Sequence, residues 1–182
     1  MKFIKELCFD PEIKVDKYKI RRAARAVVLN EENKIALMNV TKHNYYKLPG
    51  GGVEDSEDLQ MALVREIKEE VGAQIETTGE VGMIIEYRNA TKHRERGKDS
   101  PSPLCQISFC YTARVICYGQ NNLDEFEQND GFVLEWHPLD KAIELLKSSN
   151  PHGNEYVDYS GKYMVDRDLT FLKTYRASIK SQ

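Results

Sequence analysis

The apolar positions of this chain fall into short β-rich runs separated by polar breaks. Residues 25–29 and 34–40 form two such runs, and the AsnGluGluAsn segment at 30–33 between them predicts a hairpin turn. Residues that favour extended backbone (Ile, Val, Tyr, Phe and Thr) are concentrated in three later runs. These three predicted strands are 81–87, 106–118 and 132–137.

Three other segments have the spacing of helices. Residues 58–71 follow the LeuProGlyGlyGly break at 48–52, which predicts a loop directly before a helix. A second helix is predicted over 139–147 and a third over 166–178, where apolar residues recur at three-residue intervals. Because hairpins dominate the first half of the chain, we expect an α/β fold with a mixed sheet.

The length of 182 residues suits one domain with additions at its ends. Residues 1–20 are mixed and charged, with Pro11 against a helix there, and we expect an N-terminal extension. Residues 21–148 are expected to form the domain. Residues 149–182 are expected to be a C-terminal tail whose helix packs on the domain or on a partner subunit, so a homodimer is one expected arrangement.

Composition narrows the class of protein. Hydrophobic residues make up 41% and charged residues 30%, as in soluble globular proteins. The net charge of −3 gives no general attraction to nucleic acid or to an anionic membrane, so neither is expected as a partner. No run approaches the ~20 apolar residues that span a bilayer, and the N-terminus lacks the features of a signal peptide. The four cysteines have no CxxC spacing, which argues against structural zinc and favours a cytoplasmic protein.

The helix predicted over 58–71 carries a group of carboxylates. At ~100° per residue, Glu66, Glu69 and Glu70 share an arc of about 100° on one helix face. They adjoin an apolar stripe, so they lie beside the buried side of the helix. Three crowded carboxylates repel each other unless a cation neutralises them, and a hard divalent cation prefers such oxygen ligands. Taken alone, however, a glutamate-rich helix face is more often simply solvated.

The loop before this helix adds to the pattern. The glycines at 50–52 allow positive φ and a close approach of the backbone to another group. They could bring a carbonyl oxygen toward the same cation, although a tight turn alone would also explain them. Asp58 is a predicted N-cap, which places Glu57 at the junction near Arg65.

Together these residues resemble the Nudix box, in which Gly, Glu, ArgGlu, GluGlu and Gly stand at fixed spacing. The matching positions are Gly51, Glu57, Arg65, Glu66, Ile67, Glu69, Glu70 and Gly72. Ala73 stands where the family has a larger aliphatic residue, which affects packing and leaves the chemistry intact. The likeness extends to the lead-in at 46–52 and to a closing strand and helix at 135–146, and it covers roughly residues 20–148.

The resemblance implies an α/β/α sandwich with a central mixed sheet and the box as loop–helix–loop. It implies hydrolysis of a pyrophosphate bond in a nucleoside diphosphate linked to another group. By position in the box, it implies that Mg²⁺ or Mn²⁺ binds the carboxylates of Glu66, Glu69 and Glu70 with help from the Gly51 carbonyl. Glu57 would be a further ligand or a stabiliser, and Arg65 would orient the carboxylates.

The proton acceptor varies within this family between a box glutamate and a glutamate on a later loop. The candidates here are Glu69, Glu125 and Glu127, although an acidic solvated turn would equally explain the last two. Tyr46, Lys47 and Phe126 flank the expected site and are predicted to contact the substrate, an aromatic ring by stacking on a nucleobase.

The substrate is left open by the sequence. An unmodified or oxidised nucleoside triphosphate is the default, with ADP-ribose, dinucleoside polyphosphate or RNA-cap pyrophosphatases as alternatives. Arg88 stands where the ADP-ribose subclass has a proline. A non-catalytic nucleotide sensor would be expected to have lost box glutamates, and this box has lost none. An RNA-binding protein would use the basic loop at 91–103, against the overall negative charge.

Overall fold

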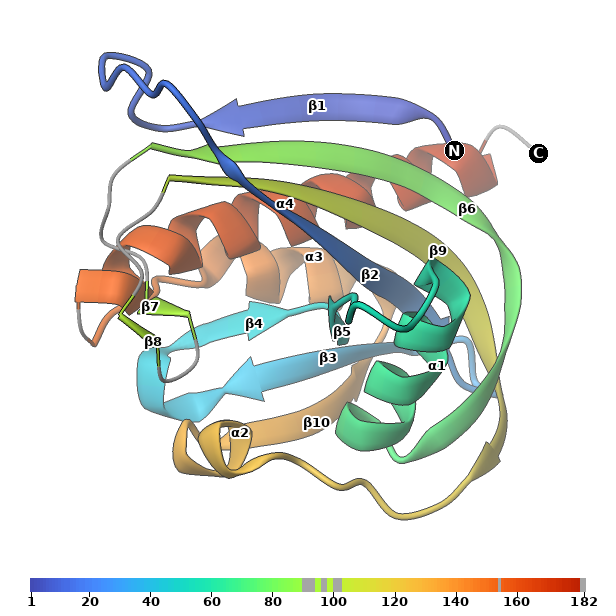
Figure 1. Cartoon of the computed structure of the whole chain (residues 1–182). Helices are drawn as coiled ribbons and strands as arrows, with labels where there is room; N and C mark the ends of the chain where they lie inside the picture. The colour runs from blue at the N-terminus through green and yellow to red at the C-terminus, as the bar shows by residue number, and fades with distance from the viewer. Residues whose placement is uncertain (90–93, 96–97, 100–102, 154, 181–182) are drawn as a thin grey trace.

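The computed structural model describes residues 1–89, 94–95, 98–99, 103–153 and 155–180. An eight-stranded sheet forms its centre, in the order β1-β6-β9-β2-β3-β10, with β4 beside β3 and β5 beside β2 (Figure 1). Its strands are β1 Phe3–Cys8, β2 Lys19–Leu29, β3 Ile35–Val40, β4 Tyr45–Lys47, β5 Gly50–Gly52, β6 Ala73–Arg88, β9 Leu104–Tyr118 and β10 Phe132–His137. A separate two-stranded ladder consists of β7 Arg94–Glu95 and β8 Lys98–Asp99.

The sheet is mixed, as the sequence predicts. β1 runs parallel to β6 and β2 runs parallel to β9, whereas β6–β9, β2–β3 and β3–β10 are antiparallel pairs. β2 and β3 form the expected hairpin, and β10 has the predicted bounds. β6 and β9 are longer than the predicted runs at 81–87 and 106–118. In the first half of β6 exposed residues alternate with half-buried ones, and most of them are polar. The apolar content of this stretch is therefore too low to mark it as a strand.

Helices cover both faces of the sheet (Figure 1). They are α1 Leu59–Glu70, α2 Glu125–Asn129, α3 Leu139–Ser148 and α4 Glu155–Lys180, with a 3₁₀ turn at Thr41–His43. One core lies between α1 and the sheet, where Leu63 and Ile67 pack against Ala24 and Ala26 of β2. The other core lies under α3 and α4. The predicted α/β/α sandwich is therefore confirmed.

Helix α1 begins and ends as its sequence dictates. The Asp58 side chain accepts hydrogen bonds from the backbone N–H groups of Gln60 and Met61, both at 2.8 Å, so the predicted N-cap is confirmed. After the helix, Gly72 adopts a φ of +68°, and a Cβ there would lie 2.6 Å from the Asn121 backbone nitrogen. The box therefore forms a helix with a fixed start and a fixed end.

Helix α4 is about twice as long as the predicted helix at 166–178. The pattern predicts only the second half, because the first half contains Gly161 and several tyrosines, which are weak helix formers on their own. Tertiary packing compensates. The fully buried Tyr163 donates to the Tyr87 carbonyl of β6 at 2.7 Å and accepts from the Phe9 N–H at 2.9 Å. The tail helix thus packs on the domain of its own chain.

The first 20 residues also take part in the sheet. β1 lies along its edge, with the Met83 N–H donating to the Lys2 carbonyl at 2.8 Å, and β2 already begins at Lys19. β1 is mostly exposed and is anchored by the buried Leu7, so it has little apolar pattern from which it could be predicted. The division into an extension at 1–20, a domain at 21–148 and a tail at 149–182 stays a prediction.

Two further expectations concern the basic loop and membrane-spanning helices. Most of the basic loop at 91–103 lies outside the described residues, so its expected role is not addressed by the structure. Among the helices of the described residues, none has both the length and the apolar character needed to cross a membrane.

Candidate active site

The loop before α1 fits closely around the helix it precedes. Gly50, in β5, adopts a φ of +123°, and a Cβ there would lie 2.3 Å from the Ala24 carbonyl oxygen. A Cβ on Gly51 would lie 2.2 Å from a carboxylate oxygen of Glu66. Gly50 is therefore required by its positive φ and its approach to the sheet, whereas a side chain at Gly51 would displace the Glu66 carboxylate.

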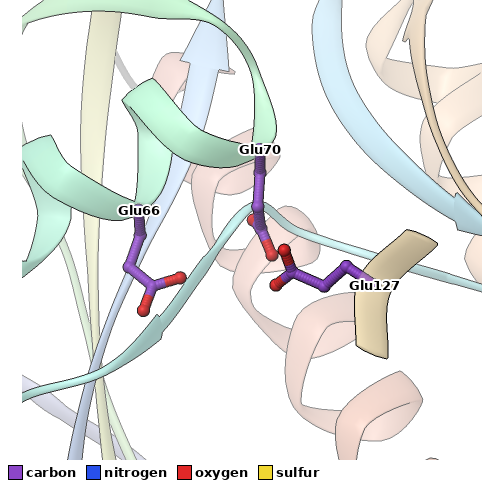
Figure 2. Close-up of side chains that lie close together, drawn as sticks. All are labelled: Glu66, Glu70 and Glu127. Carbon is purple, nitrogen blue, oxygen red and sulfur yellow. The ribbon is translucent and has the colours of Figure 1, made fainter. Parts of the chain in front are cut away.

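Three buried carboxylates meet beside this loop. One oxygen from each of Glu66, Glu70 and Glu127 lies within 4.8 Å of the other two. In Figure 2, Glu66 and Glu70 extend from successive turns of α1, and Glu127 approaches Glu70 from α2. We call these three residues the acidic cluster.

Glu70 is the most enclosed member of the acidic cluster. It is fully buried, and its two oxygens accept hydrogen bonds from the Lys47 ammonium group and the Gly50 N–H, both at 2.6 Å. Burial raises the pKa of Glu70, and the attraction of Lys47 offsets this only in part. Ionising Glu70 therefore costs free energy that a further cation in the acidic cluster would recover.

Arg65 holds the surrounding carboxylates in place. Its guanidinium group donates two hydrogen bonds to Glu57, at 2.6 and 3.1 Å, and one to the Gly52 carbonyl at 3.0 Å. It also donates to Glu66 at 2.9 Å and to Glu69 at 3.2 Å. The hydrogen bonds from Arg65 to Glu57 lower the pKa of Glu57. The orienting role predicted for Arg65 fits these contacts, and Glu57 lies beside Arg65 rather than within the acidic cluster.

Glu69 is not a member of the acidic cluster but borders it. Its side chain is 40% exposed and contacts Arg65. Burial is the main cause of a raised Glu69 pKa, which Arg65 partly opposes. A cavity of about 670 Å³ runs along this outer side of α1, and its lining includes Arg65, Glu69 and the apolar Met61 and Val64. Glu69 therefore lies beside the acidic cluster, linked to Glu66 through the Arg65 nitrogen Nη1 that donates to both, and its role as a cation ligand stays a prediction.

The two glutamates of the later acidic segment differ in the same way. Glu125 is exposed, whereas Glu127 is 5% exposed and belongs to the acidic cluster. A reciprocal pair of hydrogen bonds with Asp124, at 2.8 and 3.0 Å, fixes Glu127 in the first turn of α2. At the other end of α2, Asp130 contacts the ring nitrogen Nε2 of the buried His43 at 3.1 Å. The start of this short helix is thus capped by its own residues, and its end is tied to His43.

The predicted substrate contacts occupy three different settings. The Tyr46 hydroxyl contacts Glu135 at 3.3 Å and Asn39 at 3.2 Å. The Lys47 ammonium group donates a hydrogen bond to Glu70. Phe126 is 53% exposed on α2. Their role in substrate binding stays a prediction.

Sequence reasoning missed two residues that hold the loop. The buried Arg25 guanidinium donates to the Gly50 carbonyl and, at 3.4 Å, to the Leu48 carbonyl, and its Nε has no hydrogen-bond partner among the described residues. Burial and the neighbouring Arg167 lower the pKa of Arg25 to about 10. On α4, the buried Asp168 accepts from the Leu48 N–H at 2.9 Å. An arginine among apolar residues of a predicted strand was the available signal for Arg25, and Asp168 had none.

The donor set of the acidic cluster suits a hard divalent cation. Three carboxylates lie within reach of one point, and the absence of a side chain on Gly51 keeps its backbone next to Glu66. Arg65 donates a hydrogen bond to Glu66 and Lys47 donates one to Glu70, as supporting residues do for the ligands of metal sites. The residues present therefore fit Mg²⁺ or Mn²⁺.

Comparison with known proteins agrees with this geometry. The NUDIX domain model matches residues 19–159. An RNA pyrophosphohydrolase of a Marinomonas species is 28% identical over 134 residues, which cover 66% of this chain and 80% of that protein. A human diphosphoinositol polyphosphate phosphohydrolase is 26% identical over 147 residues, which cover 78% of this chain and 70% of that protein.

Solved structures show the same fold. A NUDIX hydrolase from Nitrosomonas europaea superimposes with a TM-score of 0.55 at 17% identity, covering 88% of this chain and 90% of that one. A MutT protein from Methanosarcina mazei gives a TM-score of 0.51 at 17% identity, covering 91% and 99%. With a family model matched over most of its length, this chain belongs to the NUDIX domain family of pyrophosphohydrolases.

Proposed function

We propose that this protein hydrolyses a pyrophosphate bond in a nucleoside diphosphate linked to another group, with Mg²⁺ or Mn²⁺ as cofactor. The observation that supports this most directly is the convergence of Glu66, Glu70 and Glu127 within 4.8 Å beside Gly51. A pyrophosphate carries negative oxygens that repel a nucleophile, so its hydrolysis needs concentrated positive charge at the site.

Glu66, Glu70 and Glu127 would hold the cation, with the Gly51 backbone as a further oxygen donor. When bound, the cation would neutralise phosphate charge and make water a better nucleophile. The protein's own groups do the positioning. Lys47 and the Gly50 N–H fix both oxygens of Glu70, and Arg65 fixes Glu66 while holding Glu57 and Glu69.

A carboxylate must also take the proton of the attacking water. Glu127 and Glu69 are the two candidates that we retain. Glu127 is supported by its place in the acidic cluster. Glu69 is supported by its place beside Glu66, with which it shares the Arg65 nitrogen Nη1, and by its raised pKa. Glu125 is exposed on α2 and is the weakest of the original candidates.

The default substrate is an unmodified or oxidised nucleoside triphosphate. A triphosphorylated RNA 5′ end is a second candidate, because several relatives, at 24–28% identity, carry the name RNA pyrophosphohydrolase. Both substrates present the same bond to the acidic cluster and differ in what extends beyond it. We propose a cytoplasmic protein, consistent with its four free cysteines, and a homodimer stays a prediction.

A substrate panel tests this proposal. Nucleoside triphosphates, ADP-ribose, nucleotide sugars, diadenosine polyphosphates and a short 5′-triphosphate RNA are incubated with Mg²⁺ and with EDTA, and both phosphorylated products of each hydrolysis are resolved by chromatography. We expect at least one of them to be hydrolysed with Mg²⁺ and all activity to be lost in EDTA. Hydrolysis that persists in EDTA would overturn the cation requirement, and nucleotide binding without turnover would favour a sensor.

A further inference from the structure

Helix α4 reaches the loop of the candidate active site through one buried side chain. The Asp168 oxygen Oδ2 accepts from the Leu48 N–H at 2.9 Å and from Arg167 Nη2 at 3.0 Å, and Oδ1 accepts from Arg167 Nε at 2.7 Å. Both α4 residues are fully buried. Asp168 therefore has a hydrogen bond to the loop in addition to its ion pair.

The residue that Asp168 holds lies between the two groups that hold Glu70. Lys47 precedes Leu48 directly, and Gly50 follows it by two positions. The Lys47 ammonium group and the Gly50 N–H are the donors to the two Glu70 oxygens, both at 2.6 Å. A displacement of Leu48 would therefore move both donors relative to the acidic cluster.

The Arg167–Asp168 ion pair is itself bonded to the sheet. Arg167 Nη1 donates to the buried Glu86 of β6 at 3.1 Å, which links Asp168 to the middle of the sheet. Tyr163, one turn earlier in α4, bonds to the carbonyl of Tyr87 at 2.7 Å. On the other side of the loop, Arg25 holds the carbonyls of Leu48 and Gly50. The backbone of this segment is thus fixed from α4, from β2 and from Glu70 itself.

We propose that Asp168 is a positioning residue of the active site, which acts on Glu70 through the Leu48 N–H. This inference rests on the proposed function, because it concerns the geometry of the proposed cation ligands. Asp168 lies beyond the matched region, which ends at residue 159. The C-terminal helix would then be part of the catalytic unit as well as part of the core.

The alternative is that Asp168 serves only as the partner of Arg167. Asp168→Asn weakens both roles, because an amide is uncharged and has one oxygen where the carboxylate has two. If that oxygen faces Leu48, the amide NH₂ faces the Arg167 Nε donor; if it faces Arg167, the NH₂ faces the Leu48 N–H. The hydrogen bond from the Leu48 N–H is weakened in either case, since a hydrogen bond to a charged acceptor is about twice as strong as one to a neutral acceptor.

Four measurements test the proposal on the full chain. They are the hydrogen-exchange rate of the Leu48 amide by NMR, Mn²⁺ binding by electron paramagnetic resonance, kcat and KM on a hydrolysed nucleotide, and the melting temperature. Asp166→Asn is the matched control, since Asp166 lies on the same helix and contacts Lys5 near the surface at 3.0 Å. Arg167→Lys, which retains the acceptor of Leu48, reports the effect of weakening the ion pair alone.

For Asp168→Asn we expect Leu48 exchange to accelerate, Mn²⁺ affinity to fall about tenfold and kcat to fall about tenfold or more with little change in KM, within the range for groups that support a metal site. Asp166→Asn should match the wild type. Arg167→Lys should lower the melting temperature and should reduce Mn²⁺ affinity less than Asp168→Asn does. Wild-type Mn²⁺ affinity and kcat in a folded Asp168→Asn protein would overturn the proposal.

A second variant covers the case in which Asp168→Asn does not fold. Replacing the Leu48 amide by an ester deletes the N–H and leaves Asp168 and Arg167 intact, and it should lower Mn²⁺ affinity to a similar extent. Wild-type Mn²⁺ affinity in the ester would overturn the proposal. Glu70→Gln distinguishes the two levels of the argument. If it retains Mn²⁺ binding and hydrolysis, the proposed function fails; if it loses both while Asp168→Asn retains them, only the positioning role fails.

Discussion

Two fully buried glutamates of this protein, Glu70 and Glu86, have opposite electrostatic settings. Burial raises the pKa of both side chains in principle. At Glu86 the attraction of Arg88 and Arg167 outweighs burial and lowers the pKa. At Glu70 burial prevails over Lys47 and the pKa is raised. The two residues therefore differ in how well the chain itself neutralises their charge.

The partners explain this difference. Arg167 donates to one Glu86 oxygen at 3.1 Å, and Arg88 donates to the other. Among the described residues Glu70 forms an ion pair with Lys47 alone, and it lies next to Glu66 and Glu127, which are also acidic. A buried carboxylate with matched cations is a structural element, whereas a buried group of carboxylates short of cations is typical of a site that binds one.

The largest effect is expected at Glu86, on the free energy of unfolding. Glu86→Gln leaves Arg88 and Arg167 buried beside a neutral amide, which should lower the free energy of unfolding by about 3–5 kcal/mol. Urea unfolding followed by the fluorescence of the single tryptophan, Trp136, measures this. A loss below about 1 kcal/mol would show that the two arginines find other partners and would end the comparison.

Glu70→Gln should instead abolish activity while the fold survives. The amide can still accept a hydrogen bond from Lys47, so the loop keeps a contact, but the negative charge is lost. We expect kcat to fall at least ~100-fold, in line with the loss of transition-state charge stabilisation. Steady-state kinetics measure this, and circular dichroism checks the fold. Full activity in this variant would contradict the proposed mechanism.

The acidic segment near α2 provides a matched pair of smaller effects. Glu127→Gln removes a proposed cation ligand and should lower kcat by at least about tenfold, the smallest loss typical of groups that only support a metal site. Glu125→Gln changes an exposed residue of the same helix and should remain within about twofold of the wild type. Equal kcat values for the two variants would remove Glu127 from the site.

The smallest effect is the pH dependence of stability without metal. The raised pKa of Glu70 means that the folded state loses stability relative to Glu70→Gln as pH rises from the unfolded value of about 4.3 through the folded pKa. The lowered pKa of Glu86 gives the opposite sign. Its contribution is present above about pH 4.3 and is lost as pH falls through the folded pKa.

Urea titrations of both Gln variants in EDTA, at several pH values, give the slopes. A shift of one pKa unit corresponds to about 1.4 kcal/mol, so differences of this size are measurable. Slopes of the same sign for the two glutamates would show that their settings are alike.

The fold was predictable where the signal was local. The β2–β3 hairpin, the bounds of β10 and the N-cap of α1 follow from residues close together in sequence. β1 and the first half of α4 were missed because their stability comes from packing against β6. A mostly exposed edge strand and a helix containing Gly161 carry too little pattern of their own.

The sequence by itself determined the kind of site. The spacing of Glu66 and Glu70, one helical turn apart, places them on one face of α1 whatever surrounds them. The glycines of the loop show that a backbone must approach closely, and Gly51 indeed lies against Glu66. These are relations between near neighbours, which helix periodicity and backbone sterics fix directly.

Only the tertiary structure decided which carboxylates meet and what holds them. It turned Glu69 toward Arg65, brought Glu127 to Glu70, and joined Asp168 to Leu48 across 120 positions of sequence. Such contacts depend on how layers of the sandwich pack, and no periodicity within either segment encodes them. The residues that distinguish this active site from a helix with a solvated acidic face are therefore those that the fold brings together.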